Sequence, residues 1–490
     1  MVRLSEAALS GLPAEVAVQH YDRSRVAAGI VHFGVGGFHR AHQAMYVDRL
    51  LAAGGASEWG ICGVGVLEAD RRMKEALEEQ DHLYTLVLKH PDGTLEPRVI
   101  GSIVDYLLAP DDPQAVVEKL ADPATRIVSL TITEGGYNFD QITREFDASN
   151  ADVRADLVPG AAPRTVFGLI VAGLALRRER GVEPFTVMSC DNIPGNGELA
   201  RRVFTAFARL RDPGLADWIA ESVHFPNSMV DRITPVTTDD DRALVTREWG
   251  IEDAWPVVAE PFEQWVLEDS FGLGRPAYEQ AGVQVVDEVE PYELMKLRLL
   301  NVGHQGLAYF GVLAGYTYAH EAARDPLFVG LLRRYWDREA RPTLRPVPGV
   351  DLDAYTAELI ERFGNEHIRD TLARLAAESS DRIPKWLVPV IRERLDAGGE
   401  VDAAAAIVAS WARYAEGVDE SGNPITIVDR LAESRHAAAL AQAEDPVAFL
   451  RDESLFGGLA SEPAFTEPYL RTLDVLHRRG ARAALEALLD

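Results

Sequence analysis

The sequence predicts an α/β protein in which an expanded Rossmann-type domain, residues 1–290, precedes a mostly α-helical domain, residues 291–490. In the first part, short β-branched runs recur and end in glycine, asparagine or aspartate, as in parallel sheets whose strands end near a ligand. After Pro291, helical periodicity and alanine runs replace them. The length of 490 residues also favours two or three domains.

Composition excludes several classes of protein. The chain has 77 Asp and Glu against 49 Lys and Arg, a net charge of −28, which argues against nucleic acid or an anionic membrane as a partner. Its two cysteines, Cys62 and Cys190, lie in or beside apolar runs, so neither a disulfide framework nor a cysteine-rich zinc site is expected. The N-terminal stretch lacks the apolar core of a signal peptide, and no uncharged apolar run reaches about 18 residues, which predicts a cytoplasmic protein. No strong self-association pattern stands out, so a monomer or weak homo-oligomer is expected.

The segment from Gly29 to Leu51 predicts a strand, a glycine turn and a helix in that order. This order is the context of a dinucleotide site, because backbone N–H groups at a helix start receive a pyrophosphate and glycine lets the phosphate approach closely. Gly34 and Gly36 fit the G-x-G-x-x-G fingerprint, but His39 stands at the third position, so a plain structural turn is an equal alternative. The expected parts are a strand at Ile30–Phe33, a turn with the candidate cofactor residues Gly34, Gly36, Gly37 and Phe38, and a helix at Ala41–Leu51.

The second expected strand, Trp59–Val66, ends at the acidic segment Leu67–Asp70. An acidic residue at this strand tip accepts hydrogen bonds from the adenosine ribose hydroxyls and repels a 2′-phosphate. Asp70 therefore favours NAD over NADP as the cofactor. The distance from Gly36 to Asp70 exceeds the usual ~20 residues, and two arginines follow directly, so NADP stays open.

Two further buried strands are expected, at Arg126–Thr133 and Phe185–Cys190. Ligands of open α/β sheets bind beyond the carboxyl ends of the strands, which places Glu134, Gly135 and Asn192 near cofactor or substrate. For Asn192 a turn-forming role is an equal alternative. The remaining expectations are a β-hairpin over residues 84–103, a helix at Gly197–Leu210 with Asn196 as its N-cap, and a loop at Pro226–Pro235 that carries an Asp-Arg pair.

Residues Pro291–Tyr316 are expected to form one buried helix that carries the chemistry. At about 100° per residue, Glu293, Lys296, Asn301 and His304 fall on one arc, with most apolar side chains opposite. Burial disfavours the charged form of a lysine, so the pKa of Lys296 is expected to fall from about 10.4 towards the working pH and make it a general base. The alternative is a lysine that snorkels to solvent or pairs with Glu293.

The chain resembles the mannitol 2-dehydrogenase family of polyol-specific long-chain dehydrogenases. The resemblance rests on GVGGFHRAHQA, TEGGY, FTVMSCDN, FPNSMVDRITP and, above all, the Lys-x4-Asn-x2-His pattern of Lys296, Asn301 and His304. It covers essentially the whole chain. It implies a metal-independent, NAD(P)-linked interconversion of a secondary alcohol and a ketone, typically D-mannitol and D-fructose. It also implies an active site in the cleft between a Rossmann domain and a helical domain.

The resemblance further implies roles for individual residues. Lys296 matches the general base, and Asn192 and Asn301 match two amides that hold the developing alkoxide. Glu293 matches a carboxylate that assists proton exchange with solvent. A zinc mechanism would need a Cys or His ligand set, and His39 and His42 lack an obvious third ligand, so no metal is expected. Substrate-binding or positioning roles fall on His304, Asp231, Arg374 and Arg382, the last standing where a mannitol enzyme of the family carries a lysine.

Three alternatives stay open. Fructuronate or tagaturonate reductases share nearly all of these motifs, and Arg374, Arg382 and Lys385 would then bind the carboxylate of a hexuronate. D-arabinitol or another polyol is an equally compatible substrate. A non-catalytic NAD-binding sensor would keep the fold, but mere binding has no use for a buried base.

Overall fold

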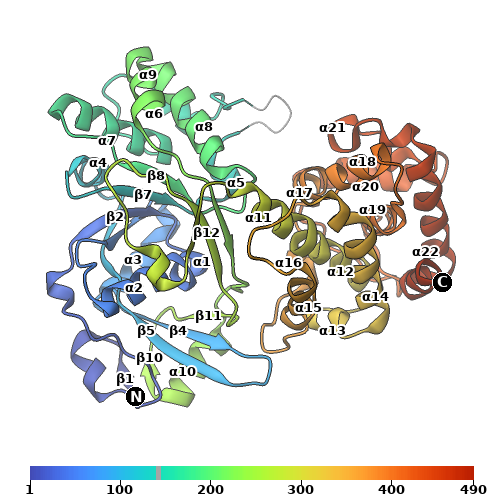
Figure 1. Ribbon diagram of the computed structural model, residues 1–490, viewed down its shortest axis with the longest axis horizontal. Helices are drawn as coiled ribbons and strands as arrows, with labels where there is room; N and C mark the ends of the chain where they lie inside the picture. The colour runs from blue at the N-terminus through green and yellow to red at the C-terminus, as the bar shows by residue number, and fades with distance from the viewer. Residues whose placement is uncertain (140–144) are drawn as a thin grey trace. The chain divides into compact units, whose positions relative to one another are not determined.

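The computed structural model describes residues 1–139 and 145–490. The chain divides into two compact units, Met1–Glu290 and Pro291–Asp490, which Figure 1 colours blue through green and yellow through red. The first unit is α/β and the second is mostly helical, so the predicted fold class is confirmed. None of the described helices combines the length and apolarity needed to cross a membrane.

A five-stranded parallel sheet forms the core of the first unit, in the order β6-β3-β2-β7-β8 (Figure 1). Its register is set at the centre, where Val31 of β2 pairs with Cys62 of β3 on one side and with Val128 of β7 on the other. The strands are β2 (Ala28–Phe33), β3 (Gly60–Gly65), β6 (Ile103–Leu108), β7 (Ile127–Leu130) and β8 (Thr186–Ser189).

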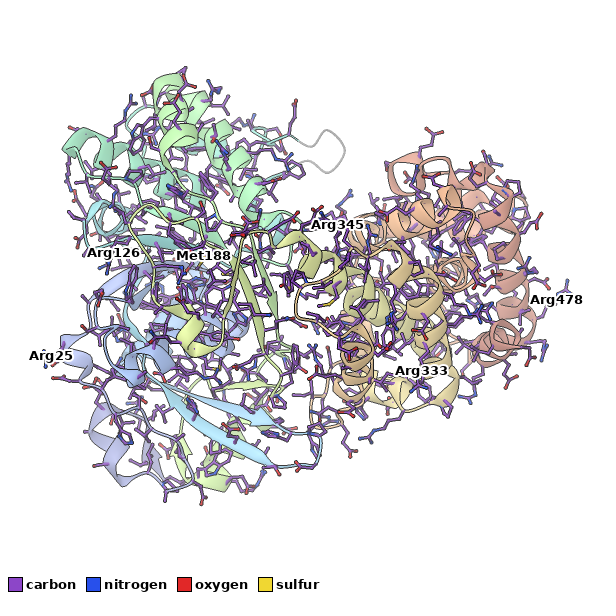
Figure 2. The ribbon with its side chains drawn as sticks, in the orientation of Figure 1. Arg25, Arg126, Met188, Arg333, Arg345 and Arg478 are labelled. Atoms are coloured by element: carbon purple, nitrogen blue, oxygen red, sulfur yellow. The ribbon has the colours of Figure 1, made fainter. Side chains whose placement is uncertain are left out.

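Alternate residues of this sheet face two separate apolar cores. Val31 and Phe33 pack on the side of helices α4 (Pro113–Ala121), α7 (Val166–Arg180) and α8 (Asn196–Arg211). Ile30 packs on the other side, with α2 (Gln43–Ala53) and the hairpin strand β4 (Tyr84–Lys89). Because both faces are covered, the strands are apolar almost throughout. Met188 of β8 accordingly lies inside this unit, whereas Arg25 points outward (Figure 2).

The predicted hairpin is confirmed, with β4 antiparallel to β5 (Leu95–Ile100). One other expectation for the first unit is wrong. The segment Pro226–Pro235 is not only a loop, because β9 (Ser228–Asp231) within it pairs with β12 (Gln264–Glu268). The helix expected at Ala41–Leu51 is confirmed as α2, which begins two residues later, at Gln43, and is separated at His42 from a short preceding helix, α1 (Gly37–Ala41).

The capping role expected for Asn196 is also wrong. Gly195 occupies the N-cap position of α8, and the side-chain oxygen of Asn227 accepts the N–H groups of Gly197 at 2.9 Å and Glu198 at 3.3 Å. The buried amide of Asn196 instead donates to the carbonyls of Asp191 at 2.9 Å and Ser228 at 2.7 Å. Its oxygen accepts the N–H of Ser228 at 3.0 Å. Asn196 therefore fastens β9 to the segment that follows β8.

Helix α12 (Val302–Leu313) is the central element of the second unit. It packs against five later helices of the described chain. Ala403–Ala406 of α19 are fully buried, and such small side chains let helices pack closely. Arg333 and Arg478 lie on the outside of this unit (Figure 2). The helices around α12 are α13 (Ala319–Ala323), α14 (Pro326–Tyr335), α16 (Leu372–Leu375), α19 (Asp402–Tyr414) and α22 (Pro463–Leu489).

The single helix expected over Pro291–Tyr316 is three segments. A π-helix, η5 (Lys296–Asn301), separates α11 (Glu290–Met295) from α12. Within it the N–H of Val302 reaches back five residues to the carbonyl of Leu297. An angle of 100° per residue therefore does not hold across this stretch.

Candidate active site

The glycine turn after β2 has the geometry of a ligand-binding turn. Gly34 has φ +93°, and a Cβ there would lie 2.1 Å from the carbonyl oxygen of Thr131, so only glycine fits. Gly36 takes the N-cap position of α1, and its N–H closes the turn on the carbonyl of Gly34 at 2.7 Å. A Cβ at Gly36 would meet nothing nearer than 3.9 Å, which leaves room for a phosphate to approach the backbone.

The departure from the fingerprint at His39 has a structural cause. The His39 ring stacks on His32 of β2, with ring centroids 3.4 Å apart and planes 13° apart. Burial lowers the pKa of His32 to about 3 and that of His39 well below its usual value, so both imidazoles are neutral. The stacked pair fixes the start of α1 on the sheet, a contact that glycine makes through its backbone in the usual fingerprint.

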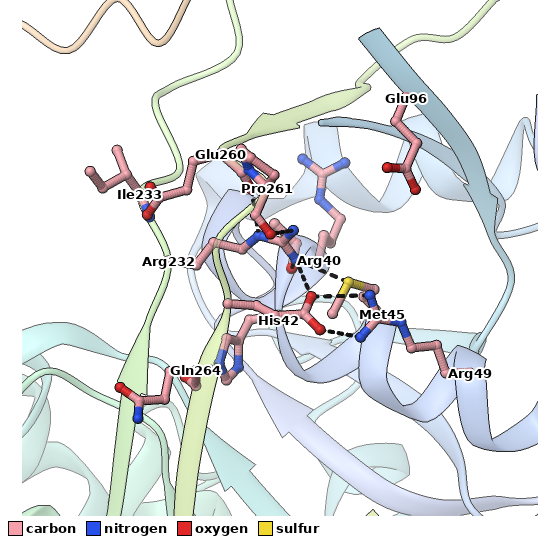
Figure 3. Close-up of polar contacts among 12 residues, drawn as sticks. Arg40, His42, Met45, Arg49, Glu96, Arg232, Ile233, Glu260, Pro261 and Gln264 are labelled. Atoms are coloured by element: carbon pink, nitrogen blue, oxygen red, sulfur yellow. Dashed lines mark hydrogen bonds and ion pairs between the residues drawn. The ribbon is translucent and has the colours of Figure 1, made fainter. Parts of the chain in front are cut away.

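Arg232 closes the break between α1 and α2 (Figure 3). Its buried guanidinium donates to the carbonyls of Ala41 at 2.7 Å and Glu260 at 3.0 Å and pairs with Glu263 at 3.2 Å. Ala41 ends α1, where the helical hydrogen-bond ladder stops, so the arginine supplies a donor to its carbonyl. Since Arg232 directly follows the buried Asp231 at the end of β9, it connects the strand of this predicted substrate residue to the end of α1.

Asp191 organises the segment that follows β7. Its carboxylate accepts the N–H of Thr133 at 2.8 Å and the hydroxyl of Tyr137 at 2.8 Å. Thr133 has φ +62°, a left-handed conformation that is strained for a threonine and that this hydrogen bond helps to hold. Burial raises the pKa of Asp191 to about 6. The exposed Glu134 and Gly135 are thereby fixed at the carboxyl end of the sheet.

A cavity of about 560 Å³ lies beyond the carboxyl ends of β3 and β6. This is where a Rossmann domain receives the adenosine half of a dinucleotide. Glu68 is part of its wall. The carboxylate of Asp70 instead accepts the N–H groups of Val66 at 2.8 Å and Leu67 at 2.9 Å, so it shapes the turn after β3. Other lining residues include Leu67, Ala109, Pro110, Gly135, Gly136 and Arg164.

Lys296 and Asn301 begin and end the π-helix η5. Their residues are 7% and 4% exposed, so both side chains are buried. In a π-turn, residues five apart lie one above the other, as residues four apart do in an α-helix, and the two side chains share one side of the helix. Nδ2 of Asn301 has no hydrogen-bond partner among the described residues. A buried donor of this kind is expected to have a ligand as its partner.

The other two polar groups of this helix flank the pair. Glu293 in α11 is buried, at 9% exposed. His304 in α12 is half-buried, and its ring lies 4.4 Å from that of Phe363, tilted by 40°. The helix therefore carries a carboxylate, an amine, an amide and an imidazole within four turns, as the sequence predicts.

The predicted substrate arginines are fixed around α16. Arg374 donates from Nε to Asp370 at 2.6 Å and from Nη2 to the second oxygen of the same carboxylate. Arg382, in α17 (Ser379–Trp386), donates to the carbonyl of Leu375 at 3.0 Å. The same carbonyl accepts Nε2 of Gln305 from α12 at 3.0 Å. The carbonyl of Leu375 thus links α12, α16 and α17. The carboxylate of Asp370 compensates the charge of Arg374.

Metal ligands do not gather in the part of the chain that the structure describes. In residues 1–139 and 145–490, no three His, Cys, Asp or Glu side chains form a group that could hold a metal ion. Cys62 and Cys190 are buried free thiols. Burial raises the pKa of Cys190 to about 12, so this thiol is protonated at neutral pH.

Three residues that shape these sites were not singled out by the sequence. The position of Asp191 at the end of a strand could have indicated its role. The prediction instead fell on its neighbour Asn192, to which the family resemblance assigns a role. Arg232 is paired in sequence with Asp231, whereas its ion pair to Glu263 is long-range. Glu68 and Asp70 lie in the same acidic tip, and only the cavity distinguishes them.

The fold and these sites define the first unit as a Rossmann-type nucleotide-binding domain. The second unit is helical and carries buried polar side chains. Models of the mannitol dehydrogenase Rossmann domain and the mannitol dehydrogenase C-terminal domain match residues 28–280 and 288–477. The chain belongs to the mannitol dehydrogenase family. This confirms the predicted family and the predicted class of enzyme, a polyol dehydrogenase.

Individual relatives support the same assignment. The chain is 47% identical over 474 residues to a mannitol 2-dehydrogenase of Phaeosphaeria nodorum, an alignment that covers 96% of this chain and 83% of that protein. Mannitol 2-dehydrogenase of Pseudomonas fluorescens, solved as a ternary complex with NAD and D-mannitol, is 46% identical with a TM-score of 0.93, covering 100% of this chain and 99% of that one. A D-sorbitol dehydrogenase in substrate-free form is 39% identical with a TM-score of 0.90, covering 99% of this chain and 100% of that one.

Proposed function

We propose that this protein is an NAD-dependent, metal-independent mannitol 2-dehydrogenase that interconverts D-mannitol and D-fructose. The observation that carries the proposal is the buried pair of Lys296 and Asn301 on one side of a π-helix. The relative solved with NAD and D-mannitol, 46% identical over the whole chain, supports the choice of cofactor and substrate. A cytoplasmic location and a monomeric or weakly oligomeric state stay predictions.

The first unit has the features that NAD requires. The turn at Gly34 and Gly36 leaves space at the backbone for a pyrophosphate. Glu68 in the cavity wall would accept hydrogen bonds from the ribose hydroxyls, and its ion pair with Arg71 keeps that guanidinium from binding the 2′-phosphate of NADP. When bound, NAD supplies the acceptor for the hydride that leaves C2 of the polyol.

Lys296 acts as the general base. Its Nζ takes the proton of the C2 hydroxyl while the hydride leaves the same carbon, and a ketone results. A buried amine suits this task because burial disfavours its charged form. Glu293, one turn earlier, would pass the proton on to solvent. The roles of Glu293 and of His304 as a substrate-positioning group stay predictions.

Asn301 stabilises the negative charge that develops on the substrate oxygen. Its Nδ2 is buried and has no partner in the described chain, so it is available as a donor. Donors aimed at a developing oxyanion contribute on the order of 10²–10³-fold in kcat. The second amide that the family resemblance assigns to this oxygen, Asn192, is exposed in the first unit and stays a prediction.

The pairing of Arg374 with Asp370 supports a neutral substrate. A guanidinium that already binds a carboxylate has lost much of its attraction for a second one, so a hexuronate is the weaker alternative. Two further polyols stay open as substrates. D-sorbitol is one, because a D-sorbitol dehydrogenase is 39% identical over nearly the whole chain, and D-arabinitol is the other.

A substrate panel followed by NADH absorbance tests the proposal. Mannitol, sorbitol and arabinitol are offered with NAD, and fructose, fructuronate and tagaturonate with NADH. We expect turnover of mannitol and fructose. Exclusive turnover of a uronate would overturn the substrate assignment, and silence on every substrate together with NADH binding would favour a sensor. Activity that chelation abolishes and a divalent metal restores would contradict the metal-independent mechanism.

The lysine base has its own test in the same assay. Lys296→Ala should bind NADH normally and lose on the order of 10²–10⁴-fold in kcat. Lys119→Ala, which removes a half-buried lysine from α4, is the matched control and should be unaffected. A kcat of Lys296→Ala close to that of the wild type would exclude the lysine as the base.

A further inference from the structure

We infer that Trp336 is a positioning residue for catalysis, because its indole holds open the π-turn that brings Lys296 and Asn301 to one side of their helix. The inference rests on the roles proposed above for these two side chains. It adds a residue that touches neither of the reacting groups and that acts through the backbone between them.

The contact is a hydrogen bond from a side chain to the main chain of the π-helix. Nε1 of Trp336 donates to the carbonyl oxygen of Leu299 at 2.9 Å. Leu299 lies inside η5, between Lys296 and Asn301. Both partners are buried, with Trp336 1% and Leu299 0% exposed, so water does not replace the bond easily.

A π-turn needs such a donor. Where the ladder returns from i→i−5 to i→i−4 hydrogen bonds, the helix contains one more carbonyl than the backbone N–H groups can serve in regular geometry. The N–H of Val302 is shared between the carbonyls of Leu297 and Leu299. The indole N–H of Trp336 therefore completes the hydrogen bonding of a carbonyl at the point where the ladder changes register.

Without this donor, a regular α-helix over the same residues becomes more stable than the π-turn. It would pair every carbonyl with the N–H four residues later and remove the extra residue from the turn. One residue corresponds to about 100° of rotation in an α-helix, so Lys296 would turn away from Asn301. The amine and the amide would then no longer meet the same substrate oxygen.

The position of Trp336 is itself fixed. It begins a second π-helix, η6 (Trp336–Ala340), which contacts η5. Glu339 in η6 accepts the N–H groups of Ala403 at 2.7 Å and Ala404 at 2.8 Å, so η6 is anchored to the start of α19. The donor to Leu299 is therefore held by the core of the unit and not by a surface loop.

Gly303 allows the indole to lie against the helix. A Cβ at this position would be 3.3 Å from Cζ2 of Trp336 and 3.3 Å from the ring of Phe363, tighter than ordinary van der Waals contact. Arg298 provides a second anchor for η5, because it donates to the carbonyl of Thr343 at 2.8 Å and to the carboxylate of Glu393 at 2.7 Å. The two anchors leave the π-turn little freedom to relax.

Trp336→Phe tests the inference, because it keeps an aromatic ring and removes only the donor and part of the volume. We expect kcat for mannitol to fall on the order of 10–100-fold, because loss of this buried hydrogen bond shifts the balance from the π-turn towards the regular helix by about that factor. KM for mannitol and the affinity for NADH should change by less than about threefold. The pH profile of kcat should also shift, because Lys296 changes its surroundings, which loss of packing elsewhere would not cause.

Trp411→Phe is the matched control. Trp411 is 2% exposed in the same unit and packs edge-on against Phe449, with the ring centroids 4.9 Å apart. It should keep the wild-type kcat and pH profile. Equal losses in the two variants would overturn the inference, as would a folded Trp336→Phe variant whose kcat stays within about twofold of the wild type.

Gly303→Ala provides the same readout if Trp336→Phe does not fold. Its methyl group pushes the indole away from the helix, so it should lower kcat and leave KM nearly unchanged, and a wild-type kcat would contradict the inference.

Lys296→Ala distinguishes failure of the proposed function from failure of this inference. If that variant is active, the proposed base is wrong; if it is inactive while Trp336→Phe is normal, only the positioning role fails.

Discussion

The guanidinium of Arg374 binds both carboxylate oxygens of Asp370, four residues earlier in the chain. The Asp370 side chain is 4% exposed, whereas that of Arg374 is 47% exposed, so the arginine keeps N–H groups that reach solvent or a ligand. Its charge is largely compensated by the buried carboxylate. Such a group suits the hydroxyls of a neutral polyol better than the carboxylate of a hexuronate.

Asp370→Asn is therefore expected to shift specificity towards hexuronates. The variant releases the full charge of Arg374, and the ratio of kcat/KM for fructuronate over fructose should rise by about tenfold, or ~1.4 kcal/mol. NADH oxidation with both substrates measures the ratio. Asp381→Asn, which breaks the ion pair with Arg430 in the same unit, is the control and should leave it unchanged. An unchanged ratio in a folded Asp370→Asn variant would show that Arg374 does not reach the distal end of the substrate.

We expect substitution of Glu68 to change the choice of cofactor and substitution of Asp70 to change the stability of the turn after β3. Glu68→Ala removes a carboxylate from the cavity wall and releases Arg71 to attract a 2′-phosphate, so the preference for NAD over NADP in kcat/KM should fall by about tenfold. Asp70→Ala removes the acceptor for two backbone N–H groups and should cost ~1–2 kcal/mol of stability. Kinetics with both cofactors and thermal unfolding measure the two effects. The opposite pattern, with Asp70 setting the preference, would support the role that the sequence predicts for Asp70.

Much of the first unit is readable from the sequence because its signals are local. A strand that ends in Gly34-Val35-Gly36 must turn sharply, and the positive φ of Gly34 follows from the carbonyl that would meet a Cβ. The break at His42 has no such signal. It depends on Arg232, which is 191 residues from the Ala41 carbonyl that it binds.

The same limit applies to the helix that carries Lys296 and Asn301. Periodicity places Lys296 and Asn301 on one arc only approximately, because it assumes an i→i−4 ladder throughout. The π-turn brings them closer in register, and the donor to its Leu299 carbonyl, Trp336, is 37 residues away along the chain. Residue types and the order of the elements could thus be predicted, whereas long-range hydrogen bonds that change a helix locally could not.

Glu339 is expected to make stability depend on pH. Burial raises its pKa to about 8 in the folded state, from 4.5 as an ordinary glutamate. The folded protein therefore binds more protons than the unfolded chain between these values, so the free energy of unfolding should decrease as pH rises through this window. The slope approaches ~1.4 kcal/mol per pH unit for one group. Thermal unfolding between pH 5 and pH 9 measures it, with Glu339→Gln expected to flatten the dependence; a slope that survives in Glu339→Gln would assign it to other groups.

Asn301→Ala is expected to lose activity without losing stability. The variant removes the proposed donor to the alkoxide, so kcat should fall on the order of 10²–10³-fold. It also removes a buried Nδ2 that has no partner in the described chain, and alanine is the better helix former, so the melting temperature should stay the same or rise. Asn196→Ala is the contrasting control, because its buried amide is bonded to Asp191 and Ser228 and its loss should cost ~1–3 kcal/mol. Thermal unfolding and mannitol oxidation measured on both variants decide the matter. A large loss of stability in Asn301→Ala would mean that this amide is a structural group of the helix, and its proposed catalytic role would have to be abandoned.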